Sequence, residues 1–190
     1  PGTTGETLTF CHGEPIWGTC PEIGDYLYGG VIFWIDPSSR QGLVCAISDD
    51  AVGQTHWGCY GDDVPGANQS VITSGAQNTY DIITENCGNA SSAAKVCDNL
   101  TLNGYSDWFL PSKDELYEMY SNKTLINTTA TSYGGTNFNS GFYWTSTEGR
   151  NNNTDEKWYA WTLRMLDGFQ EAPSKNGSTT YVRAVRYFNY

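Results

Sequence analysis

Aromatic side chains are the residues of this sequence best suited to recognition chemistry, and seven of them gather between residues 143 and 181. The flat face of an aromatic ring can stack on a sugar ring or anchor a protein interface. Aromatic rings also fill hydrophobic cores, which is the competing explanation for each member of the cluster. The cluster consists of Tyr143, Trp144, Trp158, Tyr159, Trp161, Phe169 and Tyr181.

Residues suited to catalysis are scarce in this sequence. It contains only two histidines, and neither an HExxH nor a GxSxG motif occurs. A chain with 21 acidic residues always offers pairs of carboxylates for glycoside hydrolysis. Asp107 and Glu115 are such candidates, but we expect structural roles for both, beside the start of a helix. We therefore predict that the chain is not an enzyme, and a glycan hydrolase using Asp107 or Glu115 is the alternative.

Acidic pairs in loops are the main candidates for a metal site. Asp49 with Asp50, and Asp62 with Asp63, could supply oxygen ligands to calcium. The EPN, QPD and WND triplets with which lectins bind calcium and sugar together are absent, so we favour solvated acidic loops over a structural calcium. His56 and Cys59 have a ligand-like spacing for zinc, but disulfides explain the cysteines more simply. We predict no cofactor, with calcium as the alternative.

The six cysteines form an even set without a CxxC pair, which is typical of structural disulfides and an oxidising compartment. The short separations favour three links: Cys11 with Cys20, Cys45 with Cys59, and Cys87 with Cys97. Seven Asn-x-Ser/Thr triplets agree with an extracellular protein, although an Asn- and Thr-rich chain also forms them by chance. They begin at Asn68, Asn89, Asn99, Asn122, Asn127, Asn152 and Asn176.

The net charge of −11 argues against nucleic acid as a partner, because phosphate binding depends on Lys and Arg. The charge is unevenly distributed. Residues 1–140 contain 16 acidic and 4 basic residues, whereas residues 141–190 contain 5 acidic and 6 basic ones. No apolar run approaches the roughly 20 residues of a membrane-spanning helix, so we predict no membrane insertion.

Two buried strands and two or three helices are expected to position the aromatic segment. The apolar runs Gly30 to Asp36 and Gly42 to Ser48 predict a buried hairpin. Helical spacing predicts helices over 76–86 and 91–100. Ser112 follows Pro111 and precedes Glu115 by three residues, which predicts a capping box at the start of a further helix. An Asn-, Thr- and Gly-rich loop is expected after it.

Three strand-like segments close the chain: Phe142 to Glu148, Trp158 to Leu166 and Tyr181 to Phe188. In the second, Trp161, Leu163 and Met165 alternate with Ala160, Thr162 and Arg164, which predicts one buried face and one variable face. Strands, then helices, then strands indicate an α+β fold with a mainly antiparallel sheet. We predict an extended N-terminal arm over residues 1–27, clipped to one disulfide-braced domain over residues 28–190.

Seven motifs in this order resemble a known family. The chain is similar, over residues 28–188, to bacterial and phage surface domains typified by the C-terminal domain of the Legionella collagen-like adhesin and to the major-paralogous-domain proteins. The resemblance implies a C-type-lectin-like fold, extracellular recognition and frequent trimers. The motifs are GGVIFWID at 29–36, GLVCAIS at 42–48, AAKVCDN at 93–99, DWFLPSKDEL at 107–116, YWTSTE at 143–148, AW at 160–161 and YVRAVRYF at 181–188.

Some members of this family resemble variable proteins of diversity-generating retroelements, in which a fixed frame carries substitutable positions. This implies that Tyr143, Trp144 and Trp161 belong to the frame and pack in the core. We further expect Glu148 to form a structural ion pair with Arg183 or Arg186. Asn151, Asn152, Asn153 and Asn176 fall in substitutable positions. We expect the ligand contacts to be Arg150, Asn152, Tyr159, Thr162, Arg164, Leu166, Phe169, Glu171 and Asn176.

Two functional hypotheses follow. The first is an extracellular or cell-surface adhesion domain that binds a glycan or a surface protein of a host or neighbouring cell through the loops between Glu148 and Thr180. A sulfated ligand is disfavoured, because the chain is acidic and the segment only neutral. The second is a structural subunit of an extracellular filament or fibre, assembled through the N-terminal arm. A homotrimer or a filament is the assembly we consider.

Overall fold

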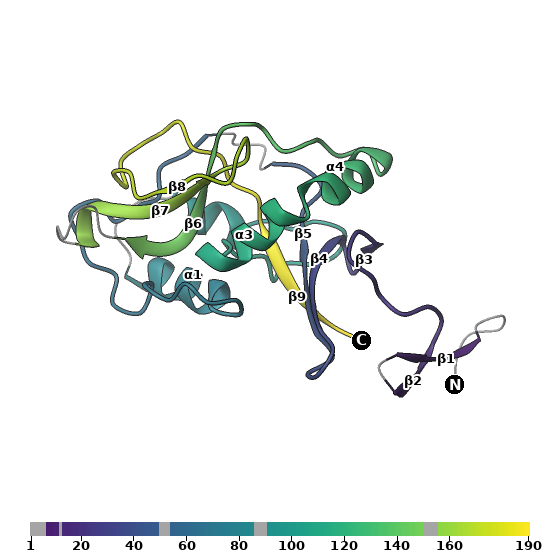
Figure 1. The fold of residues 1–190 in the computed structure, drawn as a ribbon. Coiled ribbons are helices and arrows are strands. Elements are labelled where there is room, and N and C mark those ends of the chain that lie inside the picture. The colour runs from purple at the N-terminus through teal and green to yellow at the C-terminus, as the bar shows by residue number, and fades with distance from the viewer. Residues whose placement is uncertain (1–6, 12, 50–53, 86–90, 150–155) are drawn as a thin grey trace.

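A computed structural model describes residues 7–11, 13–49, 54–85, 91–149 and 156–190, and within them the chain has an α+β fold (Figure 1). All strand pairs of its sheets are antiparallel, as predicted. The described residues contain four α-helices rather than the two or three expected. The helices are α1 (Gly75–Thr84), α2 (Ala93–Asp98), α3 (Lys113–Ser121) and α4 (Lys123–Ser132), with a short 3-10 helix, η1 (Glu156–Trp158).

The strands form two main sheets and a separate hairpin. One sheet has the order β3-β4-β5-β9, from β3 (Tyr26–Leu27), β4 (Gly30–Asp36), β5 (Gln41–Cys45) and β9 (Val185–Asn189). The second has the order β6-β7-β8, from β6 (Phe142–Gly149), β7 (Tyr159–Arg164) and β8 (Gln170–Glu171). The hairpin pairs β1 (Leu8–Cys11) with β2 (Glu14–Trp17), and Figure 1 places it apart from both sheets.

The predicted central hairpin is confirmed, because β4 and β5 are the inner strands of their sheet. Ile32 and Val44 lie opposite each other and pack into one apolar cluster, while Val31 and Cys45 pack into a second cluster on the other face. Since both faces are buried, both strands read as continuous apolar runs.

The last predicted strand is shorter than expected, because regular pairing begins only at Val185. The preceding residues pass from one sheet to the other. The amide of Tyr181 donates to Phe142 O (2.9 Å) in β6, and Ala184 O accepts from the amide of Ala46 (2.9 Å), just after β5. This crossing carries the Arg183 side chain between the sheets.

Helix α3 packs against β4, β6 and β7, and so connects the two main sheets. Its capping box is confirmed: Ser112 Oγ accepts from the Glu115 amide (3.3 Å), and Glu115 Oε2 accepts from the Ser112 amide (2.7 Å). The loop predicted after it is shorter than expected, because α4 begins at Lys123 and the loop occupies only residues 133–141. No helix in the described part of the chain is long and apolar enough to cross a membrane.

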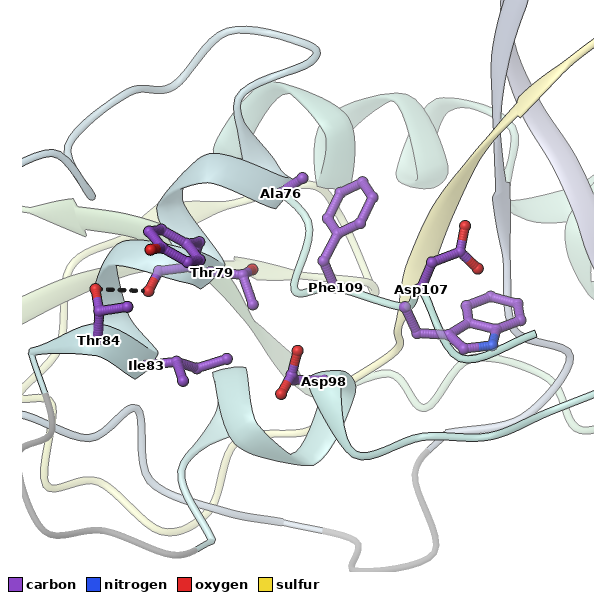
Figure 2. A pocket seen from close by; sticks show the side chains of 9 residues that line it. Ala76, Thr79, Ile83, Thr84, Asp98, Asp107 and Phe109 are labelled. Carbon is purple, nitrogen blue, oxygen red and sulfur yellow. Dashed lines mark hydrogen bonds between the residues drawn. The ribbon is translucent and has the colours of Figure 1, made fainter.

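Helices α1 and α2, together with residues 107–109, line an open and mainly apolar pocket of about 410 Å³ (Figure 2). Thr79 and Ile83 of α1 line one side, and Asp98 of α2 lines the other. Asp107 also lines this cavity, beside the buried ring of Trp108.

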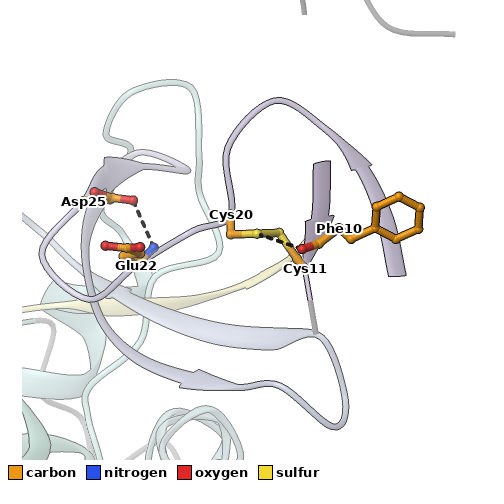
Figure 3. The surroundings of a disulfide bond; sticks show 5 residues. All are labelled: Phe10, Cys11, Cys20, Glu22 and Asp25. Carbon is orange, nitrogen blue, oxygen red and sulfur yellow. Dashed lines mark hydrogen bonds between the residues drawn. A yellow bond between two sulfur atoms is a disulfide. The ribbon is translucent and has the colours of Figure 1, made fainter. Parts of the chain in front are cut away.

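The N-terminal arm is a hairpin rather than an extended segment. The predicted bond between Cys11 and Cys20 is confirmed, with the two Cα atoms 5.5 Å apart, and it ties β1 to the segment that follows β2 (Figure 3). Phe10, beside it, is 66% exposed. The following turn is held by the Glu22 amide, which donates to Asp25 Oδ2 (2.9 Å).

The predicted bond between Cys45 and Cys59 is wrong, because Cys45 is a buried thiol whereas Cys59 is itself disulfide-bonded. The predicted bond between Cys87 and Cys97 stays a prediction, because Cys87 lies outside the described residues. Cys45 lies in the middle of the sheet opposite Val31, where burial raises the pKa of its thiol to about 12. The Cys45–Cys59 bond was predicted from the short sequence separation alone. That separation carries no information about strand pairing, which places Cys45 inside the sheet.

Candidate functional site

The turn between β7 and β8 lies at the end of the second sheet, beside Tyr120, and the register of the sheet decides which side chains lie next to it. Phe142 of β6 lies opposite Arg164 of β7, and Tyr143 lies opposite Leu163. Directly opposed residues share a face of the sheet. Tyr143 and Leu163 are fully buried, whereas Phe142 and Arg164 are half-buried on the other face, at the end of the strand.

Hydrogen bonds fix this turn. Arg164 donates through Nε to Asp167 Oδ1 (2.9 Å) and through Nη2 to Asp167 Oδ2 (2.6 Å). Asp167 Oδ1 also accepts from the Phe169 amide (3.2 Å). Gly168 has φ +76°, and a Cβ there would lie 2.6 Å from the ring of Tyr120, so glycine is required on both grounds. These hydrogen bonds and the close packing of Gly168 constrain the shape of the turn.

The turn presents an aromatic surface, which we define as Phe142, Arg164, Leu166 and Phe169. The guanidinium carbon of Arg164 lies 5.4 Å from the ring centre of Phe142 and 5.3 Å from that of Phe169. The two rings are 6.5 Å apart and nearly perpendicular. Leu166 is 65% and Phe169 50% exposed. The Arg164 guanidinium holds the pKa of Asp167 below its ordinary value, so the positive charge at this surface is paired.

The predicted contact residues do not all lie on this surface. Exposure is confirmed for Leu166, Phe169, Glu171 and Asn176, while Arg164 and Tyr159 are half-buried. Tyr159 and Arg164 occupy opposite ends of β7, roughly 16 Å apart at strand spacing. Arg150 and Asn152 lie outside the described residues.

The predicted exposure of Thr162 is wrong, because its side chain is only 1% exposed. Its hydroxyl donates to Glu171 O (3.1 Å), and it lies opposite the fully buried Trp144. The face of β7 that was expected to be variable is therefore buried at Thr162. On this face, Arg164 at the end of the strand reaches the surface.

The predicted ion pair of Glu148 with Arg183 or Arg186 is also wrong, because Glu148 pairs with Lys175. Lys175 is fully buried, and its Nζ also donates to Asp62 O (2.9 Å) and lies 4.7 Å from the ring centre of Trp57. Burial raises the pKa of Glu148 and lowers that of Lys175, since it disfavours both charged forms, while the pairing opposes both shifts.

The two arginines instead pair with acidic residues far away in the sequence, Arg183 with Asp49 and Arg186 with Asp107. Arg183 donates through Nε to Asp49 Oδ1 (2.8 Å), and Tyr143 donates its hydroxyl to Asp49 Oδ2 (2.6 Å). Both carboxylate oxygens of Asp49, a calcium candidate, therefore accept hydrogen bonds from other side chains of the protein. Asp62 and Asp63 are exposed, and Asp50 lies outside the described residues. The described residues contain no group of three or more His, Cys, Asp or Glu that could hold a metal ion.

The two carboxylates considered for catalysis are both engaged. Asp107 accepts two hydrogen bonds from Arg186, from Nε (2.7 Å) and Nη2 (2.8 Å). This pairing lowers the pKa of Asp107. Glu115 is fully buried in the capping box and also accepts from the amides of Thr73 (2.9 Å) and Gly75 (3.3 Å). Burial raises the pKa of Glu115 to about 7.

Sequence reasoning missed a second feature of the same sheet. Trp161 was expected in the core, but it is half-buried and lines a polar cavity of about 490 Å³. The ammonium of Lys113, the first residue of α3, lies 3.6 Å from the centre of its ring. The alternation along β7 predicted burial for Trp161, and no signal in the sequence placed Lys113 over it.

Comparison with known families gives one match. The family model described as the Lcl C-terminal domain matches residues 41–186. A comparison with curated proteins found no match. The family resemblance predicted from the motifs is thereby confirmed, whereas the relation to C-type lectins and to retroelement variable proteins stays a prediction.

Proposed function

The chain belongs to the Lcl C-terminal domain family, and from this premise we propose that it is an extracellular or cell-surface recognition domain. It binds a glycan or a surface protein through the aromatic surface of the β7–β8 turn, without chemical change of the ligand. The observation that carries the proposal is the exposure of Leu166 and Phe169 on a turn fixed by the Arg164–Asp167 pair.

Rigidity supports a binding role for this surface. A binding surface that is ordered before contact loses less entropy on association. The guanidinium carbon of Arg164 lies 5.4 Å from the ring centre of Phe142 and 5.3 Å from that of Phe169, so the two rings flank it in a defined arrangement. Rings and an arginine at the centre of a patch are also the side chains that contribute most to binding energy at interfaces.

Charge supports a ligand that is not a polyanion. The exposed cation of the aromatic surface, Arg164, is already paired with Asp167. The whole chain has a net charge of −11. Apolar contact and hydrogen bonding are therefore expected to provide the affinity, as on the apolar face of a neutral sugar or in a protein interface.

The test is binding of the labelled domain to a printed glycan array and to a panel of fixed cells. Periodate treatment of the cells removes a glycan ligand, and protease treatment removes a protein ligand. We expect Phe169→Ala to weaken binding about 30-fold, the effect of removing an interface side chain worth about 2 kcal/mol. Arg164→Ala should also weaken binding, because it removes the group that orders both rings.

Stability provides the control, because exposed side chains contribute little to folding. We expect the melting temperature of Phe169→Ala to stay close to that of the unchanged protein. Tyr80→Ala is the matched variant: Tyr80 is a 62% exposed aromatic residue on α1, and its loss should leave binding unchanged. Equal binding by Phe169→Ala and the unchanged protein would exclude this surface as the site.

A further inference from the structure

A polar cleft lies beside the start of α3, on the face of the second sheet opposite the aromatic surface. Trp161 shares its face of β7 with Leu163, whereas Arg164 points to the other face, because side chains alternate along a strand. The cleft has a volume of about 490 Å³, within the range of small-molecule sites. Lys113, Trp161, Asn68, Ser70 and Thr147 contribute to its lining.

The walls of the cleft are fixed by hydrogen bonds from three elements. The Lys113 amide donates to Thr147 Oγ1 (3.1 Å), whose hydroxyl donates to Gln69 O (2.9 Å). Ser70 O accepts from the amide of Asp114 (2.9 Å). Asn68 and Ser70 are therefore held beside the first turn of α3 rather than on a loose loop.

Gly149 of β6 allows the indole of Trp161 to approach this strand. A Cβ at position 149 would lie 2.8 Å from Trp161 Cδ1 and 2.9 Å from Nε1. The edge of the indole that carries its N–H group therefore packs close to backbone. Its ring lies under the Lys113 ammonium, at 3.6 Å from ring centre to Nζ. Ring and ammonium together form one wall with two hydrogen-bond donors.

The cleft has donors without matching acceptors. Lys113 forms no ion pair with the described part of the chain, and Trp161 Nε1 donates to none of its atoms. Glu148 also lines the cleft, but Lys175 and the Val64 amide occupy its carboxylate. An ammonium and an indole N–H beside each other match a ligand with an anionic acceptor.

We infer that the Lys113–Trp161 cleft binds a small polyhydroxylated carboxylate, a sugar acid of the glucuronate type. A carboxylate has two oxygens, one for the Lys113 ammonium and one for Trp161 Nε1–H, and a single negative charge that one ammonium balances. The side chains of Asn68 and Ser70 can exchange hydrogen bonds with sugar hydroxyls, because each has a donor and an acceptor. A dianion such as sulfate would leave one charge unbalanced beside Glu148.

The experiment is calorimetric titration of the folded chain with sodium glucuronate, glucose and sodium sulfate at constant ionic strength. We expect saturable binding of glucuronate and none of glucose or sulfate. Lys113→Met should weaken glucuronate binding about 10-fold or more, the effect of losing a charge-assisted hydrogen bond. Trp161→Phe keeps a ring but loses the N–H group, and should weaken binding about 5-fold.

Two controls make the result specific. Lys95→Met removes a positive charge from α2 and should leave glucuronate binding unchanged. Phe169→Ala should also leave it unchanged, so failure of the proposed aromatic surface and failure of this cleft are separate results. Circular dichroism verifies that each variant is folded, and Trp161→Phe carries the test if Lys113→Met is not. Absence of saturation by about 10 mM glucuronate, or equal binding by the folded variants, would overturn the inference.

Discussion

Replacing Lys175 by Met should destabilise the fold more than any surface change, because it leaves a buried acid without its partner. The side chains of Lys175 and Glu148 are 0% and 2% exposed. Lys175 Nζ also donates to Asp62 O (2.9 Å) and Cys59 O (3.4 Å), so the substitution leaves two carbonyl groups without this donor. Breaking a buried ion pair by removing one partner costs about 3–5 kcal/mol.

A second substitution separates the loss of the pair from the loss of packing. Glu148→Gln removes the charge but keeps an oxygen for the Val64 amide, which lies 3.2 Å from the carboxylate oxygens. The double variant Lys175→Met with Glu148→Gln no longer buries an unpaired charge. We therefore expect it to be more stable than Lys175→Met alone by about 1–2 kcal/mol, within the range measured for neighbouring residues that interact.

Urea unfolding followed by tryptophan fluorescence measures these differences, with the disulfides kept oxidised. The deficit of Lys175→Met should shrink as the pH falls, because Glu148 can then bind a proton and lose its charge. A loss below about 1 kcal/mol in Lys175→Met, or a double variant no more stable than the single one, would refute a buried ion pair that stabilises this fold.

Two further predictions concern buried groups. Burial raises the pKa of Glu115 to about 7, so the stability that its protonated form contributes is fully present below about pH 4.5 and is lost as the pH rises through about 7. From about pH 5 to about pH 8 the unchanged protein should lose about 2.5 kcal/mol of unfolding free energy relative to Glu115→Gln, and parallel urea-unfolding profiles of the two would disprove this. Cys45 is a fully buried thiol with a pKa of about 12, so iodoacetamide should modify it only after unfolding. Mass mapping of native and unfolded samples checks this, and rapid native labelling of Cys45 would contradict the buried position.

The sequence predicted those elements whose determinants are local. Strand β4 has the predicted bounds, because burial of both faces makes its residues a continuous apolar run. The start of α3 was predicted because the Ser112–Glu115 capping box spans only four residues. The sequence did not predict α4, since its many Thr residues have low helix propensity. Ile126 and Ala130, four residues apart, are buried against the sheet, so tertiary packing accounts for this helix.

The candidate site was predicted less completely, because its arrangement depends on contacts between distant residues. Glu148 was expected to pair with an arginine of the last strand, but the crossing between the sheets carries Arg183 and Arg186 to Asp49 and Asp107. These pairs span 134 and 79 residues. Alternation along β7 predicted the buried face correctly at Leu163. It failed at Thr162, because other parts of the fold cover the opposite face of β7 there. The residue pattern of one strand carries no information about such tertiary contacts.

The ion pairs also change the meaning of the charge count for residues 141–190. Lys175, Arg183 and Arg186 are all buried in ion pairs, so they add no positive charge to the surface. Without these pairs the segment retains four acidic and three basic residues, one of which, Arg164, is itself paired with Asp167.

A polyanionic ligand would therefore meet less positive charge on this segment than its composition indicates. Lys113, by contrast, belongs to the strongly acidic first part of the chain and carries its charge into a cleft without an ion pair to the described residues. The cation that we propose for ligand binding is therefore Lys113, the first residue of α3, and not a buried Lys or Arg of the C-terminal segment. A charge count by segment does not reveal which cations remain available after folding. Comparing the glucuronate affinities of Lys113→Met and Lys95→Met tests whether Lys113 is the cation that the ligand uses.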